Sequence, residues 1–248
     1  MHRNTAVIIL AAGLGTRMKS DRAKVLHPVC GKPMISYVLE TAKEINALDI
    51  VVVVGHQADE VMAACHELPN VKFAMQKQQL GTGHAVLCAL PSLSRSVEQA
   101  VILCGDVPLL SVSTVTALIE DHMNHSRILS LLAVEVDSPT GYGRIKMDSQ
   151  RKLSGIVEEK DASPDEKQIK LINAGIYCVN RDFLQTSLKK ITPDNAQKEL
   201  YLTDIIEIGY KAQQNIGVLV GDNNEEVMGI NTIQDLNSVE ALMEKRSR

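Results

Sequence analysis

The sequence contains no tryptophan and only two phenylalanines, and aromatic residues make up 3% of its 248 residues. Proteins that hold single-stranded nucleic acids usually stack the bases on aromatic side chains, so this class of function is disfavoured. The chain also has no excess of positive charge: 26 lysines and arginines stand against 30 acidic residues, for a formal net charge of −4. A general nucleic-acid binder needs a basic face, and we therefore expect no nucleic-acid partner.

Long apolar runs and paired cysteines are also absent. No run approaches the roughly 18–20 apolar residues that cross a membrane, and the first run is broken at Gly13, which is atypical of a signal peptide. The five cysteines form no Cys-x-x-Cys pair. An odd number of scattered cysteines is typical of reduced thiols, so we expect a cytoplasmic protein with no membrane partner.

Short apolar runs alternate with segments of helical spacing in the first half of the chain. With 45% hydrophobic residues, the chain is large enough for one substantial core. The alternation predicts βαβ units and an α/β fold, in which a mostly parallel, Rossmann-like sheet carries helices on both faces. The predicted strands are residues 7–10, 49–54, 71–75, 100–104 and 128–136, and the predicted helices are residues 33–42, 59–68, 84–90 and one capped by Ser111 or Ser113.

After residue 136 the pattern becomes less regular. Residues 141–145 and 153–158 predict the two strands of a hairpin, and the charged stretch 159–170 predicts a solvated excursion. No internal repeat or flexible linker interrupts the chain, so we expect a single domain. Further along, the pattern predicts strands at residues 171–179, 216–220 and 227–229 and helices at residues 181–190, 202–213 and 233–246.

The first apolar run, Val7–Leu10, leads into Gly13 and Gly15, which are followed by a threonine and Arg17. Glycines allow a sharp turn after a strand and bring backbone N–H groups close to an anion. Arg17 can grip phosphate oxygens with its guanidinium, and Lys24 supplies a second cation within reach of the loop. The stretch therefore predicts a phosphate-binding loop.

Two better-known glycine loops do not fit this stretch. A dinucleotide fingerprint needs a third glycine where Met18 stands, and the Gly-Lys-Ser/Thr of a P-loop is absent. A bare Gly-x-Gly pair can equally be a tight strand-to-loop turn. The continuation from Gly15 through Arg17 to Lys24 favours phosphate binding over that simpler interpretation.

Polar residues follow two further predicted strands. Gln76 comes directly after residues 71–75 and precedes Gly81-Thr82, and Asp106 comes just after residues 100–104. Ligands of open α/β sheets bind at the carboxyl ends of the strands. Asp106 could simply cap a turn before Pro108. Beside a phosphate loop, a carboxylate at a strand end favours Mg²⁺, which takes one or two carboxylates together with phosphate oxygens.

The histidines do not form a metal site. His122 and His125 are three residues apart but have no acidic helical partner of the kind found in zinc enzymes, so we expect both to be surface residues.

A series of sequence blocks resembles the sugar-nucleotide pyrophosphorylases, and within them the uridyltransferase domains of the bacterial bifunctional N-acetylglucosamine-1-phosphate uridyltransferase/glucosamine-1-phosphate acetyltransferases. The blocks occur in order between Val7 and Asn231 at the family's spacing. They are Leu10–Met18, Lys24–His27, Gln79–Ala85, Gly105–Leu109, Thr140–Arg144, Ile156–Glu158, Asn173–Ile176, Tyr201–Asp204 and Gly229–Asn231.

This resemblance implies roles for the matching residues. Arg17 and Lys24 would be catalytic, and Asp106 and Asn231 would hold Mg²⁺. Gly143, Glu158 and Asn173 would contact the amino sugar. The remaining implied contacts to the uridine and the phosphates come from Leu10, Ala11, Ala12, Gly13, Gly15, Lys24, Gln76, Gly81, Thr82, Cys104, Gly105, Asp106 and Asn231.

From the residues alone, two of these assignments have simpler alternatives. Glu158 could be a solvated charge before Glu159, and Asn231 could cap the helix that begins near Ile233. Only the resemblance favours the sugar and metal roles.

The reaction implied by the resemblance is transfer of UMP from UTP to N-acetylglucosamine 1-phosphate, which gives UDP-N-acetylglucosamine and pyrophosphate in a Mg²⁺-assisted, in-line displacement. Two alternatives stay open. One is a nucleotidyltransferase of the same fold that acts on another nucleotide or sugar 1-phosphate, and the other is a non-catalytic module that senses nucleotide sugars.

The resemblance also suggests how the chain is organised. We expect a single nucleotidyltransferase domain with a nucleotide-binding core (about 1–136), a sugar-binding lobe (about 137–231) and a closing helix (232–248). The bifunctional relatives continue into a β-helix that carries acetyl transfer and most of the trimer contacts. This sequence lacks the hexapeptide repeats of a β-helix, so we expect no acetyltransferase activity here. The assembly state stays open.

Overall fold

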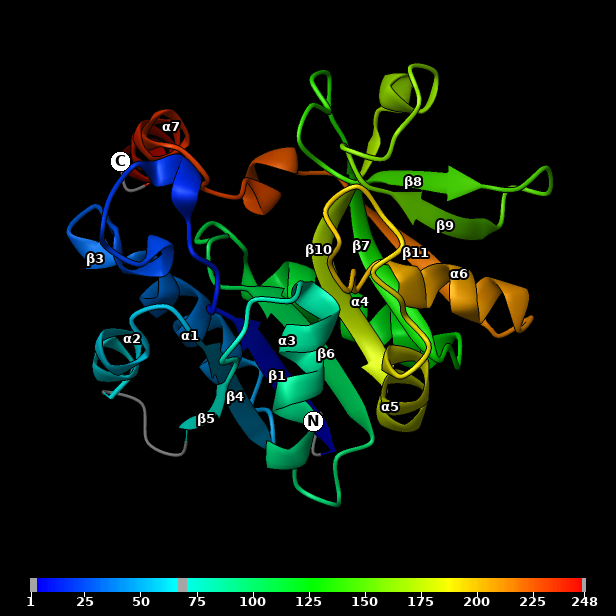
Figure 1. Cartoon of the computed structure of the whole chain (residues 1–248), viewed down its shortest axis with the longest axis horizontal. Helices are drawn as coiled ribbons and strands as arrows, with labels where there is room; N and C mark the ends of the chain where they lie inside the picture. The colour runs from blue at the N-terminus through cyan, green and yellow to red at the C-terminus, as the bar shows by residue number, and fades with distance from the viewer. Residues whose placement is uncertain (1–3, 67–70, 247–248) are drawn as a thin grey trace.

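Strand β1 (Thr5–Leu10) lies near the middle of the central sheet, between β4 (Asp49–Val54) and β6 (Gln99–Cys104). The structure, a computed structural model, describes residues 4–66 and 71–246. The other strands along the sheet are β5 (Val71–Met75), β7 (Leu129–Glu135), β10 (Leu171–Asn180) and β11 (Ile216–Gly221). Within the described residues the strand order is β11-β7-β10-β6-β1-β4-β5 (Figure 1).

Most of these strands point the same way, as the sequence predicted. β5, β4, β1 and β6 are parallel neighbours, and β11 is parallel to β7. β10 alone runs against both β6 and β7. The chain moves outward from β1 to β4 and β5 and then returns to the other side of β1 as β6. This reversal of strand order makes the carboxyl ends of β1 and β6 the expected place for a ligand.

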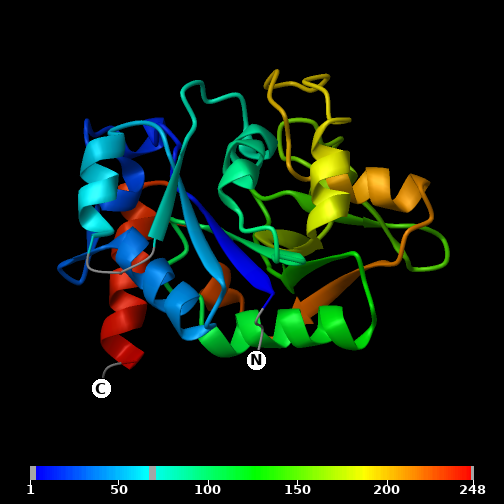
Figure 2. The ribbon, with the colours of Figure 1, turned by 90° about the horizontal axis from the view of Figure 1, so that it is seen from below.

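Alternating residues of each strand face two separate helical layers. Val7 and Ile9 pack with one set of helices, and Ala6 and Ile8 pack with the other set. The first layer contains α1 (Met34–Glu44), α2 (Ala58–Ala64) and α4 (Val112–Asn124), and the second contains α3 (Thr82–Ala89), α5 (Arg181–Leu188) and α6 (Asp204–Lys211). Figure 2 shows α4 on one side of the sheet and α3 and α5 on the other.

The predicted hairpin is present as β8 (Arg144–Met147) and β9 (Leu153–Val157), which pair antiparallel. It joins the central sheet where Arg144 pairs with Ile172 of β10. The closing helix α7 (Ile233–Arg246) returns to the N-terminal part of the chain, where its Val239 packs in a cluster with Met18 and Val29. The C-terminal helix therefore lies beside the loop that follows β1.

Short elements complete the described chain. They are the two-residue strands β2 (Pro28–Val29) and β3 (Lys32–Pro33), and the 3-10 helices η1 (Thr16–Met18), η2 (Lys24–Leu26), η3 (Leu90–Ser92), η4 (Glu166–Gln168) and η5 (Asn224–Val227). No helix among the residues that the structure describes is both long and apolar enough to cross a bilayer. All five cysteines are free thiols.

Two predicted elements differ from the structure. The strand predicted at 227–229 is wrong, because η5 occupies residues up to Val227 and Asn223 caps it by accepting a hydrogen bond from the Glu225 N–H. The helix predicted at 59–68 is α2, whose last residue is Ala64, and residues 67 and 68 lie outside the described residues. The side-chain cap of η5 is a local polar contact that the apolar pattern does not reveal.

The surface position expected for His122 is also wrong, whereas His125 is exposed as expected. His122 is 1% exposed on the inner face of α4. Its ring nitrogens lie 3.0 Å from the Ser130 hydroxyl and 3.1 Å from the Gln99 side-chain oxygen. A buried imidazole is tolerated because both nitrogens have polar partners.

Burial of this imidazole predicts an acid-sensitive fold. Desolvation, with a smaller contribution from the nearby Arg127 charge, lowers the pKa of His122 from 6.5 to about 4. The unfolded chain therefore binds this proton more tightly. The stabilisation is complete above pH 6.5 and is lost as the pH falls towards 4, which amounts to about 2 kcal/mol between pH 7 and pH 5. The pKa of Asp204, which burial raises to about 6, acts in the opposite direction over this range, so urea unfolding of the wild type at both pH values must be compared with a variant that lacks the imidazole.

The matched variant is His122→Gln, which keeps a polar side chain but cannot titrate. Its free energy of unfolding should change less between pH 7 and pH 5 than that of the wild type. An equal pH dependence in the two proteins would contradict the assignment of the effect to His122.

Candidate active site

The loop after β1 brings the chain back against itself. Gly15 has φ of +62°, and a Cβ at this position would lie 2.7 Å from the Cβ of Lys24. A side chain at position 15 would therefore be strained and would push η2 away. The glycine allows Lys24, at the first residue of η2, to lie directly against the loop.

Four predicted residues from separate parts of the chain meet beside this loop. Lys24 Nζ forms an ion pair with the Asp106 carboxylate and donates a hydrogen bond to Asn231 Oδ1 at 3.0 Å. Arg17 Nη2 donates to the same Asn231 oxygen at 2.8 Å. The Lys24 and Asp106 side chains are 18% and 17% exposed. The group therefore places two cations, a carboxylate and an amide oxygen at a partly open surface.

The structure separates the two interpretations of Asn231. The helix α7 is capped by Thr232 and Asp235: Asp235 Oδ2 accepts hydrogen bonds from the backbone N–H groups of Asn231 and Thr232, and Thr232 Oγ1 accepts from Asp235 N. This reciprocal arrangement satisfies the helix start. The side-chain oxygen of Asn231 is left to face Lys24 and Arg17.

The Asp106 carboxylate likewise contacts Lys24, and the turn before Pro108 is closed by backbone hydrogen bonds. Val107 N donates to Cys104 O at 3.3 Å, and Ile230 N donates to Asp106 O at 2.9 Å. This last bond ties Asp106 to the segment that carries Asn231. The two oxygen-bearing side chains are thus held next to each other by backbone contacts.

The residues fit Mg²⁺ by their donor chemistry. A carboxylate oxygen and an amide oxygen point at one cation, the Lys24 ammonium, and both are the hard oxygen ligands that Mg²⁺ prefers. Magnesium usually completes its shell with water and substrate phosphates, so a full protein cage is not required. In the part of the chain that the structure describes, no group of three or more His, Cys, Asp or Glu residues forms such a cage.

A cavity of about 420 Å³ opens next to this group at the carboxyl ends of β1 and β6. Of the residues singled out in the sequence, those that line it are Leu10, Ala11, Ala12, Gly13, Gly15, Lys24, Gln76, Gly81, Thr82, Cys104 and Asp106. Gly105 donates its backbone N–H to Leu10 O at 3.0 Å, which joins the ends of the two strands beneath the cavity.

Other lining residues were not singled out from the sequence. They are Leu14, Thr16, Val25, Gln79, Ala85 and Glu199. Leu14 and Thr16 belong to the glycine loop itself, so their proximity to that loop was an available signal. Glu199 comes from a distant loop, and no local pattern marks it.

Close backbone packing brings the Glu199 loop to the cavity. Gly81 has φ of +110°, and a Cβ there would lie 2.6 Å from the carbonyl oxygen of Leu200. Leu200 N donates to Leu80 O at 2.7 Å, and Leu202 N donates to the Thr82 hydroxyl at 3.0 Å. Gly81 is therefore required for this approach at the start of α3.

The Gln76 side chain is 3% exposed and is fixed in one orientation. Its Nε2 lies 3.1 Å from Gly81 O and 3.1 Å from His84 Nδ1. A backbone carbonyl only accepts hydrogen bonds, so the amide nitrogen must be the atom that faces Gly81. The side-chain oxygen of Gln76 is consequently turned away from these two partners.

The three residues predicted to contact the amino sugar, Gly143, Glu158 and Asn173, also lie next to one another. Asn173 N donates to Gly143 O at 2.9 Å, and a Cβ on Gly143 would lie 3.3 Å from Glu158 Oε2. Glu158 Oε1 accepts a hydrogen bond from Thr203 Oγ1 at 3.1 Å. Desolvation raises the pKa of Glu158, so this residue is not the solvated charge that its neighbours in the sequence suggest.

Cys104 lies between the predicted sugar-contacting residues and the cavity. It lines the cavity, and its Sγ donates to Gly175 O at 3.5 Å, two residues beyond Asn173. Burial raises the pKa of the Cys104 thiol to about 12. The thiol therefore stays protonated at neutral pH and does not have the lowered pKa that a nucleophilic cysteine requires.

The stretch 159–170 is not simply solvated, because its first residue holds the loop that presents Gly143. Arg144 is 1% exposed, and its Nη2 donates to Glu159 Oε2 at 2.6 Å. The same carboxylate oxygen accepts from Gly141 N at 3.1 Å. The Arg144 hydrogen bond is the main cause of the lowered pKa of Glu159. The sequence predicted Arg144 only as a strand residue. Because its charged side chain is buried, it requires an ion-pair partner such as Glu159.

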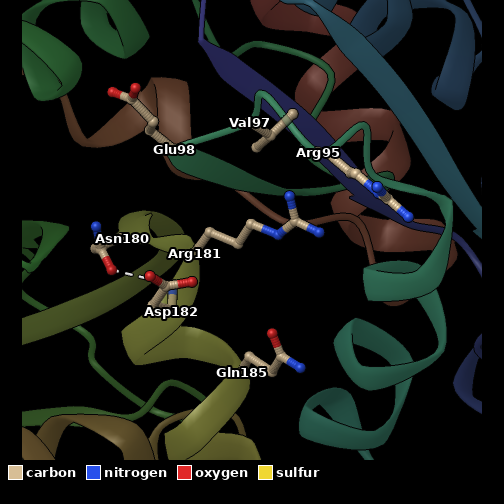
Figure 3. Close-up of a pocket in the computed structure, with 7 residues that line it drawn as sticks. All are labelled: Arg95, Val97, Glu98, Asn180, Arg181, Asp182 and Gln185. Atoms are coloured by element: carbon tan, nitrogen blue, oxygen red, sulfur yellow. Dashed lines mark hydrogen bonds between the residues drawn. The ribbon is translucent and has the colours of Figure 1, made fainter.

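A second cavity, of about 410 Å³, lies where β6 begins and β10 ends, and Figure 3 shows the residues that line it. Its lining carries balanced charge, with Arg95 and Arg181 against Glu98 and Asp182. Arg181 Nη1 already donates to Ser94 O at 2.7 Å. None of the residues singled out in the sequence lines this cavity, so the cavity beside Lys24 is the candidate active site.

The comparison with known families gives the class of protein. The chain belongs to the Nucleotidyl transferase family, which it matches over residues 6–245. The resemblance to nucleotidyl transferases is therefore confirmed, and with it the enzyme class.

Individual proteins similar to this chain are named Bifunctional protein GlmU. The protein of Geotalea uraniireducens is 48% identical over 233 residues, which cover 92% of this chain and 50% of that protein. The protein of Desulfotalea psychrophila is 45% identical over 227 residues, covering 92% of this chain and 67% of that protein. The chain thus spans about half the length of the first of these relatives and two thirds of the second.

Among solved structures, a UDP-glucose pyrophosphorylase complexed with UDP-glucose superimposes with a TM-score of 0.77 at 18% identity. The match covers 98% of this chain and 99% of that one. At this identity the likeness is evidence for the fold alone, and it confirms the predicted α/β architecture.

Proposed function

We propose that the chain transfers UMP from UTP to N-acetylglucosamine 1-phosphate, with release of pyrophosphate. The observation that carries the proposal is the meeting of Arg17, Lys24, Asp106 and Asn231 beside the glycine loop. High identity to proteins named GlmU supports the choice of substrates.

In this reaction a phosphate oxygen of the sugar 1-phosphate attacks the α-phosphorus of UTP. A new P–O bond forms at the α-phosphorus, and the bond to the bridging oxygen of the β-phosphate breaks, so that pyrophosphate leaves with the electron pair. The attacking phosphate has a second pKa of about 6 and is mostly ionised at neutral pH. No general base is needed.

The barrier then lies in aligning two anions and stabilising charge at phosphorus. Arg17 and Lys24 supply fixed positive charge beside the loop, and the backbone N–H groups around Gly13 and Gly15 supply dipoles. Asp106 and Asn231 would hold Mg²⁺, which when bound neutralises phosphate charge and orients the oxygens. Lys24 contacts Asp106 and Asn231 and lies against the loop, so its charge stands between the proposed metal ligands and the proposed phosphate site.

The fixed amide of Gln76 supports uracil as the base. With its nitrogen committed to Gly81 and His84, Gln76 presents its oxygen to a ligand. The ring N–H of uracil is a donor for such an oxygen, whereas the corresponding ring nitrogen of cytosine is an acceptor. Thr82 and Gly81 line the same part of the cavity.

The amino sugar is proposed to contact Gly143, Glu158 and Asn173, with Cys104 between this group and the uridine side. The nucleotide-binding core (about 1–136) and the sugar-binding lobe (about 137–231) thus form one domain with the closing helix 232–248. Its strands share one sheet, since β10 lies between β6 and β7. Free cysteines support a cytoplasmic location.

A paired-substrate assay tests the proposal. Pyrophosphate release would be followed with each of UTP, dTTP, CTP and ATP against N-acetylglucosamine 1-phosphate, glucosamine 1-phosphate and glucose 1-phosphate, in the presence of Mg²⁺. We expect the highest kcat/KM for UTP with N-acetylglucosamine 1-phosphate. A higher value for another pair would assign a different nucleotidyltransferase activity, and no release from any pair would favour a sensing module.

A further inference from the structure

Strand β10 is irregular just after Asn173, one of the residues proposed to contact the amino sugar. Asn173 pairs with Ala133 of β7, but Tyr177 pairs with Leu131, so four steps along β10 match two steps along β7. Gly175, in the middle of this bulge, has φ of +74°. The bulge shortens the path between the two flanking side chains, which in a regular strand would stand ~13 Å apart.

The bulge brings these side chains into direct contact. Asn173 Nδ2 donates a hydrogen bond to the Tyr177 hydroxyl at 2.7 Å, and Gly175 N donates to Asn173 Oδ1 at 3.0 Å. The Gly175 N–H can only donate, so the amide oxygen must be the atom that faces it. Both ends of the Asn173 amide are therefore fixed, and one hydrogen of Nδ2 is left for a ligand.

Tyr177 is a rigid partner for this contact. It is 2% exposed, and its ring packs in the apolar layer that contains α5 and α6. Its hydroxyl stays protonated, because burial raises the pKa of Tyr177 well above its ordinary value. A buried side chain with a fixed ring loses little further entropy when it holds a neighbour in place.

We propose that Tyr177 is a positioning residue for the sugar phosphate: its hydroxyl holds the Asn173 amide so that the remaining N–H points to the sugar. This inference rests on the proposed function. Without the hydroxyl, the hydrogen bond from Gly175 N to Asn173 Oδ1 still restrains the planar amide, but the Nδ2 side of the amide has lost its partner. The amide then oscillates over a wider range about its terminal torsion, and binding must narrow this range to the productive orientation.

Tyr177→Phe removes one oxygen and keeps the ring. We expect KM for N-acetylglucosamine 1-phosphate to rise about 3–10-fold, the range that one hydrogen bond supplies. The KM for UTP and kcat should stay within about twofold of wild type. The matched control is Tyr37→Phe, which removes a hydroxyl that donates to Val29 O at 2.8 Å outside the cavity, and which should change none of the three constants.

A double-mutant cycle with Asn173→Ala separates positioning from a general structural effect. If Tyr177 acts through Asn173, Tyr177→Phe will not change KM for the sugar phosphate further when Asn173 is already alanine. The same fold-change in both backgrounds would overturn the inference, as would an unchanged KM in the single variant. Thermal melting checks that Tyr177→Phe, which keeps the buried ring, is folded like the wild type.

The two proposals fail in different ways. A wild-type chain that releases no pyrophosphate from UTP and N-acetylglucosamine 1-phosphate overturns the proposed function and this inference with it. A wild-type chain that is active, with a Tyr177→Phe variant that behaves like it, overturns the inference alone.

Discussion

Replacing Lys24 with alanine is expected to lower kcat by about 10²–10³-fold at saturating UTP, sugar phosphate and Mg²⁺, the loss typical of one contact to developing charge. The ammonium is the group that touches both Asp106 and Asn231 beside the phosphate loop. Alanine keeps the Cβ against which Gly15 packs, so the loop geometry should survive. Steady-state pyrophosphate release measures the effect.

Lys32→Ala is the matched control for Lys24→Ala. Lys32 is also in an ion pair, with Glu40, but does not line the cavity. It should retain wild-type turnover, since exposed ion pairs contribute little. A folded Lys24→Ala variant with kcat within threefold of wild type would contradict the catalytic role.

Asp106→Asn is expected to lower kcat/KM by a similar factor, about 10²–10³, and to raise the Mg²⁺ concentration needed for half-maximal activity. The substitution keeps the size of the side chain but removes the negative charge, and a neutral amide binds Mg²⁺ more weakly than a carboxylate. The backbone bond from Ile230 N to Asp106 O does not depend on the side chain, so the site should stay assembled.

The Mg²⁺ activation curve is the measurement for this second variant. Asp121→Asn serves as its control, because Asp121 is likewise paired with a cation, Arg127, but lies on α4 away from the cavity. Activation curves of Asp106→Asn and wild type that superimpose would show that Asp106 does not hold the metal.

The glycine loop and the strand ends could be predicted because they depend on residues that are close together in the sequence. Runs of β-branched residues form strands where they are buried, and residues 49–54 therefore have the predicted bounds. Polar residues that follow such runs fall at one edge of a parallel sheet. This is why Gln76 and Asp106 line the same cavity as Gly13.

Features that depend on long-range packing could not be predicted in this way. The antiparallel position of β10 between β6 and β7 has no signature in its own residues. The burial of His122 depends on polar partners in other elements, Ser130 and Gln99. The approach of Glu199 to the cavity depends on contacts with Gly81, more than a hundred residues earlier.

The contact between Asn173 and Tyr177 depends both on local sequence and on long-range packing. Glycine at position 175 is visible in the sequence, but its positive φ and the shift of register appear only when β10 is paired with β7. A regular strand would keep the two side chains apart. The sequence therefore places Asn173 in a predicted strand, and the resemblance implies a sugar contact, but neither indicates what orients its side chain.

The central claim is that one group of charges, built from Arg17, Lys24, Asp106 and Asn231, receives the phosphates of both substrates. A crystal structure with a non-hydrolysable UTP analogue, N-acetylglucosamine 1-phosphate and Mg²⁺ tests it most directly. We expect the α-phosphate and the sugar phosphate to lie against Lys24, with the metal on Asp106 and Asn231. Phosphates bound away from Lys24, for example beside Arg95 and Arg181 in the second cavity (Figure 3), would contradict the claim.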